Sequence, residues 1–167
     1  YGFESTVMLS LLGGAAFDAG RPFYPADIAQ ALNSVPRPRA LVTTPFHLKT
    51  LLLSGVELPQ VDLLLCATAP LTPQLAALAE QKQAETLLGG RMLEIYGCTE
   101  AGQLATRRTT AGQTWTTLGE VRITQRDDET FIAHGGHVFA PTPLADILTL
   151  HNSQEFGLLG RANDLIH

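Results

Sequence analysis

The sequence has few cysteines and few lysines, and each scarcity limits what the protein can be. The only cysteines, Cys66 and Cys98, both follow apolar runs, so reduced thiols in a cytosolic protein are favoured over a disulfide. The only lysines are Lys49 and Lys82. No apolar run reaches the roughly 18–20 residues that a membrane-spanning helix needs. We therefore expect no membrane span and a cytoplasmic location.

Positive charge and recognisable nucleophile motifs are scarce as well. The formal net charge is −5 at pH 7, which argues against nucleic acid as a partner because non-specific binding needs a basic surface. His134, His137 and His151 lack the spacing of metal ligands, so no zinc site is expected. The absence of a Gly-x-Ser-x-Gly elbow argues against an α/β hydrolase. The sequence shows no pattern of His and Asn residues that would activate Cys98, which argues against a thiol nucleophile.

The first part of the chain alternates helical and strand-like patterns. Thr72 followed by Pro73 is typical of a helix start, with an N-cap residue and a proline at the first helical position. The apolar run 61–67 is typical of a strand that is covered on both faces. Alternation of this kind predicts a mostly parallel sheet with right-handed crossovers. We expect helices over 5–12, 25–33, 45–54 and from 72 onward, and strands over 15–17, 40–44, 61–67 and 91–97.

The pattern changes after about residue 104 to short strand-like segments, separated by turn residues such as Asp127-Asp128 and Gly135-Gly136. We predict an α/β fold with a mostly parallel lobe over residues 1–104 and a small antiparallel, β-barrel-like portion over residues 105–167. Because the chain opens without Met and ends abruptly, we expect a segment of a longer protein. The expected later strands lie at 104–110, 117–125, 130–136, 145–151 and 155–161.

Three loops follow predicted parallel strands, namely "TTPFH", "CATAPL" and "YGCTE". Ligands of parallel sheets bind beyond the carboxyl ends of the strands, so these loops would line one crevice if the strands are neighbours. Tyr96 offers a flat face for a base, and Gly97 allows close backbone approach. Thr99 and Glu100 offer oxygen ligands that suit Mg²⁺ held together with phosphates. The alternative is that Tyr96 packs in the core and Glu100 caps a following helix.

An ordered set of motifs resembles the adenylate-forming superfamily of acyl- and aryl-CoA synthetases, luciferases and nonribosomal adenylation domains. The set is "YGF…LLGGAAF", "TTPFHLKTLL", "LLLCATAPLTPQLAALAEQ", "MLEIYGCTEAG" and "FGLLGRANDLI", and it resembles part of the large N-terminal domain. The resemblance implies that a small carboxylic acid attacks ATP in the presence of Mg²⁺, giving an acyl-adenylate and pyrophosphate. Coenzyme A, or the phosphopantetheine of an acyl carrier protein, then accepts the acyl group.

The resemblance also implies a role for each matched residue. Thr99 would contact the α-phosphate, Glu100 would hold Mg²⁺, and Asp164 would be the hinge of a C-terminal lid. The adenine and ribose would be bound by Ala67, Thr68, Ala69, Pro70, Tyr96, Gly97, Asp146 and Arg161. The candidates for contacting the acid are Tyr1, Phe3, Thr43, Thr44, Phe46 and His47.

The sequence departs from the family pattern in ways that bear on activity. The family's ribose-binding acid follows a threonine and a glycine, whereas Asp146 follows Leu144 and Ala145 here. The family's adenine loop is rich in glycine, whereas this chain has "CATAP". Neither Lys49 nor Lys82 lies in a motif that matches the two catalytic lysines of the family. We therefore expect the chain alone to be inactive, and self-association through an exposed sheet edge is also expected. The competing hypothesis is a non-catalytic remnant that binds a nucleotide or a protein.

Overall fold

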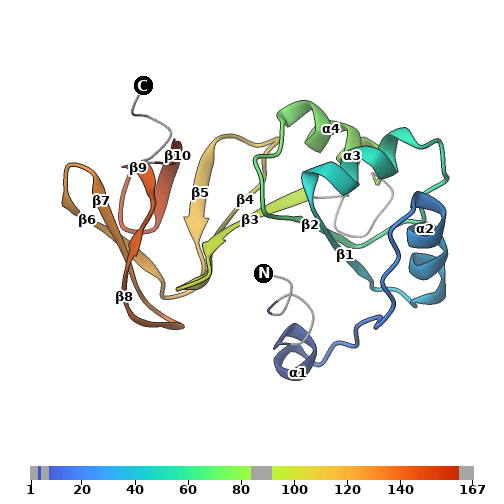
Figure 1. Ribbon diagram of the computed structural model, residues 1–167, viewed down its shortest axis with the longest axis horizontal. Coiled ribbons are helices and arrows are strands. Elements are labelled where there is room, and N and C mark those ends of the chain that lie inside the picture. Colours follow the sequence, from blue (N-terminus) through green and yellow to red (C-terminus); the bar gives the residue numbers. More distant parts are fainter. Residues whose placement is uncertain (1–3, 5–7, 84–91, 162–167) are drawn as a thin grey trace. The chain divides into compact units, whose positions relative to one another are not determined.

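The computed structural model describes residue 4, residues 8–83 and residues 92–161, with only the backbone described at position 161 (Figure 1). Within the chain, two compact units can be distinguished. The first unit comprises Tyr1–Glu94 together with Arg108–Thr110, and the second comprises Ile95–Arg107 and Ala111–His167. The strand that contains Glu94 and Ile95 therefore contributes to both units.

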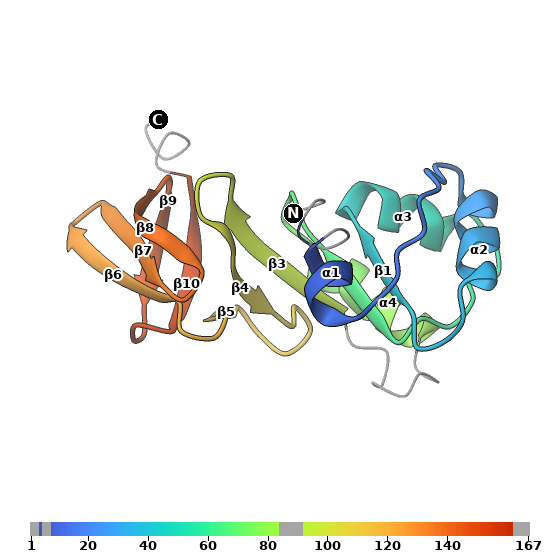
Figure 2. The ribbon, with the colours of Figure 1, turned by 90° about the horizontal axis from the view of Figure 1, so that it is seen from below.

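The first unit is built on parallel strands. Its strands are β1 (Ala40–Thr43), β2 (Leu63–Cys66) and the beginning of β3 (Met92–Cys98), hydrogen-bonded in the order β1-β2-β3. Both pairs are parallel, so the predicted parallel sheet is confirmed. Helix α2 (Pro25–Ser34) precedes β1, and helices α3 (Pro45–Leu53) and α4 (Pro73–Lys82) connect the strands, as Figures 1 and 2 show.

Local signals in the sequence explain where the helices begin. Thr44 and Thr72 are the N-caps of α3 and α4, and each side-chain hydroxyl accepts a hydrogen bond of 3.3 Å from the backbone N–H three residues later. A proline follows each cap, where its missing N–H costs nothing to the helix. The predicted start of α4 is therefore confirmed. No helix in the described part of the chain is long and apolar enough to cross a membrane.

Leucine side chains dominate the core of the first unit. Leu64 and Cys66 of β2 are buried, whereas Leu63 and Leu65, which alternate with them, are half-buried. Burial of this apolar surface is the main favourable term in folding the unit. The other buried side chains around β2 are Leu32, Leu48, Leu52, Val61, Leu71, Ala76, Ala79 and Met92.

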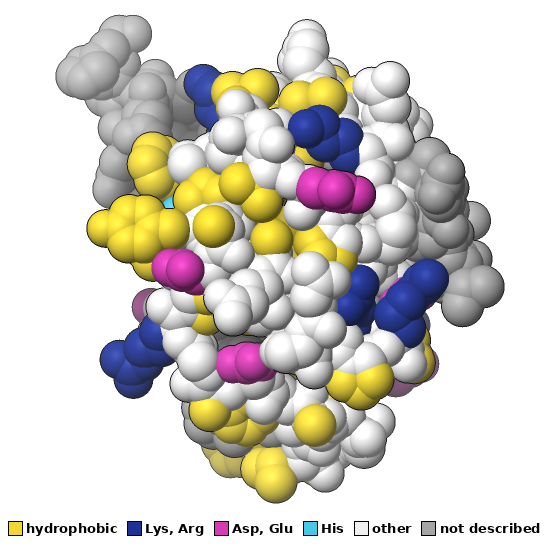
Figure 3. Space-filling view, turned by 90° about the vertical axis from the view of Figure 1, so that its right-hand side faces the viewer, with side chains coloured by type: hydrophobic (Ala, Val, Ile, Leu, Met, Phe, Trp, Pro, Cys, Tyr) yellow, Lys and Arg dark blue, Asp and Glu magenta, His cyan; other side chains and the backbone are white. Residues whose placement is uncertain are grey.

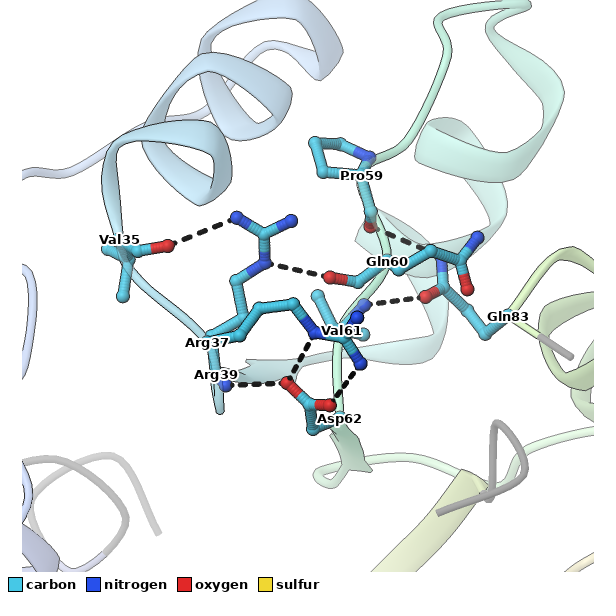
Figure 4. A network of polar contacts seen from close by, with 8 residues as sticks. All are labelled: Val35, Arg37, Arg39, Pro59, Gln60, Val61, Asp62 and Gln83. Carbon is cyan, nitrogen blue, oxygen red and sulfur yellow. Dashed lines mark hydrogen bonds and ion pairs between the residues drawn. The ribbon is translucent and has the colours of Figure 1, made fainter. Parts of the chain in front are cut away.

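A network of hydrogen bonds connects the segments that lead into β1 and β2 (Figure 4). The Arg37 guanidinium forms two hydrogen bonds to the Asp62 carboxylate, Nη2 to Oδ1 at 2.5 Å and Nε to Oδ2 at 3.2 Å. The Arg39 backbone N–H donates to Asp62 Oδ2 at 2.9 Å, and its Nε donates to the Gln60 carbonyl at 2.7 Å. The buried Gln83 side chain accepts from the Val61 N–H at 2.7 Å. This network lies at the end of the strands opposite the predicted ligand loops.

The N-terminal prediction is wrong in one element. Residues 15–17 were expected to form a strand, but residues 15–23 form neither helix nor strand. Phe17 is exposed there, and a short strand without a neighbour to pair with has no partner for its backbone hydrogen bonds. Before this stretch, helix α1 (Leu9–Gly13) ends where Gly14 adopts a left-handed conformation, with a φ of 68°.

The second unit is antiparallel, as predicted. The pairs β4–β5, β5–β10, β9–β10, β6–β7 and β7–β8 are all antiparallel. One sheet continues from β3 in the order β3-β4-β5-β10-β9, and a separate sheet has the order β6-β7-β8. The strands are β4 (Gly102–Arg107), β5 (Thr114–Thr117), β6 (Arg122–Asp127), β7 (Thr130–Gly135), β8 (Val138–Leu144), β9 (Asp146–Leu150) and β10 (Glu155–Arg161).

Two strands of the second unit were not predicted. β8 contains Pro141 and Pro143, and proline disfavours a strand because it cannot donate to the ladder. β8 is nevertheless at the edge of its sheet, where proline is tolerated. β5 has one apolar residue, Trp115, which packs with Tyr96 and Phe156 at ring-centroid distances of 5.8 and 6.5 Å. These three rings form the centre of the second core.

Candidate functional site

In the first unit, two of the predicted ligand loops leave the sheet at the same level. Thr43 at the end of β1 lies opposite Cys66 at the end of β2, and Cys66 lies opposite Glu94 in β3. These strands are therefore neighbours, which is the condition for their loops to lie together. The loops that begin at Thr44 and Ala67 therefore emerge together from the carboxyl edge of the sheet, which is where ligands of parallel sheets bind.

The loop between β2 and α4 is an exposed arch held at both ends. At one end, the Ala67 N–H donates to the Thr43 carbonyl at 3.1 Å. At the other, the Leu71 N–H donates to Glu94 Oε1 at 3.0 Å. Ala67 and Leu71 are buried, whereas the three predicted adenine-contacting residues between them (Thr68, Ala69 and Pro70) are exposed. The middle of the arch is thus exposed to solvent, while both of its ends are hydrogen-bonded to the sheet.

Thr68 has an unusual backbone conformation for its residue type. Its φ is 85°, and it is the one non-glycine residue with positive φ in the described part of the chain. A β-branched side chain is strained in this region, which glycine occupies freely. The sequence "CATAP" therefore carries a threonine where the loop needs a glycine-like turn.

Glu94 is a site residue that sequence reasoning missed. Its side chain is 3% exposed, and Oε2 accepts a hydrogen bond of 2.5 Å from the hydroxyl of Thr109. A buried carboxylate needs such partners because burial without them is costly. The signal in the sequence was an acidic residue inside the otherwise apolar strand "MLEIY". Burial, and then the charge of Glu94, raises the pKa of the Cys66 thiol to about 12, so the thiol is protonated at neutral pH.

The predicted acid-contacting residues Thr44, Phe46 and His47 lie at the start of α3. Thr44 caps the helix, Phe46 is 71% exposed, and the His47 ring meets the Phe23 ring edge-on with a centroid distance of 5.2 Å. Phe46 is therefore not a core residue. Thr43 is buried at the end of β1. Tyr1 and Phe3 lie outside the described residues.

An open apolar groove of about 440 Å³ runs beside Phe46, between α3 and α4. Figure 3 shows the face of the molecule on the α2–α4 side, where apolar side chains gather in the upper half. Lys49 is the one charged residue among those that line the groove. The other lining residues are Pro45, Phe46, Leu53, Pro70, Thr72, Gln74, Leu75 and Leu78.

In the second unit, the structure brings together two predicted nucleotide-binding residues. The Tyr96 hydroxyl donates a hydrogen bond to Asp146 Oδ2 at 2.8 Å. The Tyr96 ring is 9% exposed and meets the Phe156 ring edge-on at 5.6 Å, so Tyr96 also packs in the core. Arg161 lies opposite Asp146 in the β9–β10 register, which brings a third predicted residue to the same level. Asp164 lies outside the described residues.

The turn that carries Thr99 and Glu100 joins β3 directly to β4. Both side chains are exposed, and no helix follows, so the alternative that Glu100 caps a helix is wrong. A Cβ atom added to Gly97 would lie 2.2 Å from the Gly102 carbonyl oxygen, because the two strand backbones approach closely there. Burial, together with its hydrogen bond to Glu100, raises the pKa of the Cys98 thiol.

The described residues contain no group of three or more His, Cys, Asp and Glu side chains that could hold a metal ion. Glu100 offers one exposed carboxylate in an open turn. A metal ion held there would need further oxygen ligands from a bound molecule, such as phosphate groups.

Comparison with solved structures identifies the fold of the chain. An acyl-CoA synthetase (AMP-forming)/AMP-acid ligase II-like protein from Dyadobacter fermentans matches 79% of the chain with a TM-score of 0.54 and 20% identity. Wild-type E. coli MenE with a bound m-phenylether-linked analogue of OSB-AMS matches 92%, with a TM-score of 0.69 and 16% identity. The chain has the fold of the AMP-forming acyl-CoA synthetases. ATP-bound MatB from Rhodopseudomonas palustris shares this synthetase fold over 90% of the chain, with a TM-score of 0.61 and 17% identity.

The chain spans only part of each synthetase. It covers 39% of the Dyadobacter protein, 35% of MenE and 34% of MatB. No model of a protein family matches the sequence, and no curated protein does either. The synthetase fold is thus recognised through structure, at sequence identities of 20% or less in these three comparisons.

Proposed function

We propose that this chain is a segment of an AMP-forming acid–thiol ligase and forms much of its nucleotide and acid pocket. The ligase would adenylate a carboxylic acid with ATP and transfer the acyl group to coenzyme A or to an acyl carrier protein. One observation carries the proposal. In a fold shared with ATP-bound MatB, residues 67–71 form an arch that is hydrogen-bonded at both ends and exposed in its middle, at the carboxyl edge of parallel strands.

The proposed nucleotide contacts use the chemistry of the residues present. The exposed backbone of Thr68, Ala69 and Pro70 would face the adenine, and Asp146 with Arg161 would bind the ribose hydroxyls. Tyr96 would contact the base with its ring while its hydroxyl holds Asp146, which supports a role for both in one subsite. The strand backbones approach closely at Gly97, which leaves no room for a side chain there. This supports a role of Gly97 in the shape of that subsite.

The phosphates would meet the turn after β3. Thr99 offers a hydroxyl for the α-phosphate, and the exposed Glu100 carboxylate fits Mg²⁺ if phosphate oxygens complete its coordination. When bound, Mg²⁺ would neutralise charge that develops on the phosphates. The carboxylic acid would lie near Thr44, Phe46 and His47, together with Phe3.

We further propose a role for each of the two parts of the chain. The mostly parallel lobe over residues 1–104 would carry the adenine and acyl loops. Residues 105–167 would contribute strands to a small β-barrel that ends at a hinge, Asp164, to a lid. We also propose a cytoplasmic location and self-association of the segment.

A second function is favoured by the positions of the two lysines. The Lys82 ammonium donates to the Leu52 carbonyl at 2.8 Å, which commits it to the end of α3. Lys49 lines the groove between α3 and α4. Neither lies in a motif that matches the catalytic lysines of the family, so we expect neither to stabilise charge on the phosphates. A protein that binds a nucleotide without catalysis is therefore the second candidate.

One experiment separates the two candidates. Calorimetric titration with ATP–Mg²⁺ and AMP would be combined with a pyrophosphate-release assay over a panel of aryl and fatty acids, on this chain and on the full-length protein. Pyrophosphate release by the full-length protein with one class of acid supports the ligase. Binding without release from either supports the non-catalytic protein. Absence of nucleotide binding in both would overturn both candidates.

A further inference from the structure

Glu94 links the arch to a distant part of the chain. We propose that Glu94 and Thr109 are positioning residues that set the shape of the arch (residues 67–71) for recognition of the nucleotide base. This inference rests on the proposed function, because it takes the arch to bind a nucleotide base. The hydrogen bonds that join Leu71, Glu94 and Thr109 lie within the first unit and do not depend on that proposal.

The carboxylate of Glu94 uses its two oxygens on two different segments. Oε1 accepts from the Leu71 N–H at 3.0 Å, and Oε2 accepts from the Thr109 hydroxyl at 2.5 Å. Glu94 is 3% exposed and Thr109 is 6% exposed, so water does not compete freely for either group. Hydrogen bonds to a charged acceptor in such surroundings are stronger than those between neutral groups.

The two ends of the arch are held by different groups. The backbone bond from Ala67 to Thr43 continues the β1–β2 ladder and fixes only the near end. The far end is fixed by the bond from Leu71 to Glu94. Between them, Thr68 holds a φ of 85°, and strained backbone of this kind persists only where its surroundings hold it. Releasing Leu71 would let Thr68 relax and move the exposed backbone groups.

The segment that carries Thr109 is itself fastened on both sides. The Arg108 guanidinium binds the Glu80 carboxylate of α4 through two bonds of 2.9 and 3.0 Å. The Thr110 hydroxyl donates to the same carboxylate at 3.0 Å. Thr109 is therefore held between two anchored neighbours, and its hydroxyl has a fixed direction toward Glu94. A fixed donor orients the carboxylate, and the carboxylate in turn orients Leu71.

A positioning role makes a prediction that simple stabilisation does not. The arch would contact only the base, so loosening it should reduce discrimination between bases without affecting binding of the phosphates. Loss of folded protein, in contrast, would weaken binding of every ligand by the same factor. Base selectivity is thus the readout that separates positioning from stability.

The test uses Thr109→Val, which removes the hydroxyl and keeps the side-chain shape, and Glu94→Gln. The matched control is Thr110→Val, because it removes the neighbouring hydroxyl that binds Glu80 instead. Amide hydrogen exchange at Leu71 is measured in each protein, together with the dissociation constants of AMP, GMP and pyrophosphate. We expect Thr109→Val to speed exchange at Leu71 and to weaken AMP binding, each about tenfold, as the loss of one buried hydrogen bond implies. GMP and pyrophosphate binding should change less than twofold, and Thr109→Ser should restore AMP binding.

Several results would overturn the inference. Unchanged exchange at Leu71 in both Thr109→Val and Glu94→Gln would show that this linkage does not hold the arch. Equal weakening of AMP and GMP binding would remove the role in base recognition. An effect of Thr110→Val as large as that of Thr109→Val would assign the change to general loosening. If the wild-type protein binds no nucleotide, the proposed function fails, and the exchange measurement still decides whether Glu94 and Thr109 hold the arch.

Discussion

Tyr96 and Asp146 are joined by a hydrogen bond of 2.8 Å although they lie 50 residues apart in the sequence. The bond ties the strand that leaves the first unit to β9 within the second. It means that the orientation of the Asp146 carboxylate depends on a hydroxyl whose ring is fixed by Trp115 and Phe156. If these two residues form a nucleotide subsite as proposed, the bond would orient the carboxylate before a ligand binds.

We first predict the effect of removing this hydroxyl. Tyr96→Phe keeps the ring in the aromatic core but leaves Asp146 without this donor. The free energy of unfolding, measured by urea denaturation, should fall by about 1.5–3 kcal/mol, the usual value for a hydrogen bond to a charged group. Tyr24→Phe is the control, since Tyr24 is 67% exposed, and it should leave stability unchanged. Equal stabilities of the two variants would show that the bond contributes nothing.

The strained turn at Thr68 leads to a second prediction. Thr68→Gly should raise the midpoint of thermal unfolding, with a gain of about 0.5–1 kcal/mol in stability, because glycine tolerates a φ of 85° and threonine does not. Thr68→Ala is the matched control: it removes the β-branch yet still has a Cβ atom, so its gain should be smaller. A loss of stability in Thr68→Gly would contradict the presence of strain.

Gly97 provides a third prediction. Gly97→Ala would place a methyl group 2.2 Å from the Gly102 carbonyl oxygen, so the two strand backbones must separate. We expect a loss of about 2–4 kcal/mol in the free energy of unfolding, as for other severe overpacking. Gly157→Ala serves as the control within the same unit, since the nearest atom to its added Cβ would be 3.9 Å away. Similar losses in both variants would mean that close approach at Gly97 is not the cause.

The fourth prediction concerns acid pH. Hydrogen bonds from the Arg37 guanidinium and then from the Arg39 N–H hold the pKa of Asp62 below its ordinary value of about 3.9. A group whose pKa is lower in the folded than in the unfolded protein contributes stability above the unfolded pKa and loses that contribution as pH falls through the folded pKa. Stability of the wild-type protein should therefore decline as the pH falls from about 5 toward 3 and lower.

The variant Asp62→Asn isolates this effect. It removes the titrating carboxylate, so stability at neutral pH should drop and the decline with acid should become shallower. Asp128→Asn, at an exposed turn between β6 and β7, is the control and should keep the wild-type pH dependence. Urea denaturation between pH 3 and pH 7 would measure both slopes. An unchanged slope in Asp62→Asn would assign the acid sensitivity to other groups.

The sequence predicted the elements whose signals are local. The start of α4 could be predicted because Thr72 and Pro73 act within one helical turn. The strand expected at residues 15–17 was wrong because a strand needs a partner, which no local pattern reveals. β8 was missed for the converse reason: Pro143 is compatible with a strand only because β8 lies at a sheet edge, and the edge is a property of the whole fold.

The candidate site also has features that the sequence predicts and features that it does not. The loops after β1 and β2 could be placed because parallel strands end at one edge of a sheet. The linkage through Glu94 could not be predicted, since it joins Leu71 and Thr109 from segments 23 residues before and 15 residues after it. Tyr96 shows a mixed outcome, because its ring is in the core while its hydroxyl contacts the predicted ribose residue.

The path of β3 has a consequence for protein engineering. Glu94 and Ile95 are consecutive residues of one strand, yet they belong to different units, and Arg108–Thr110 returns to the first unit before the chain continues in the second. A chimera with its crossover point at the boundary between the units would interrupt β3. It would also take Thr109 and its hydrogen-bond partner Glu94 from two different proteins. Recombination with another protein of this fold would therefore best exchange residues 92–110, which include Glu94, as one cassette together with Glu80, the partner of Arg108.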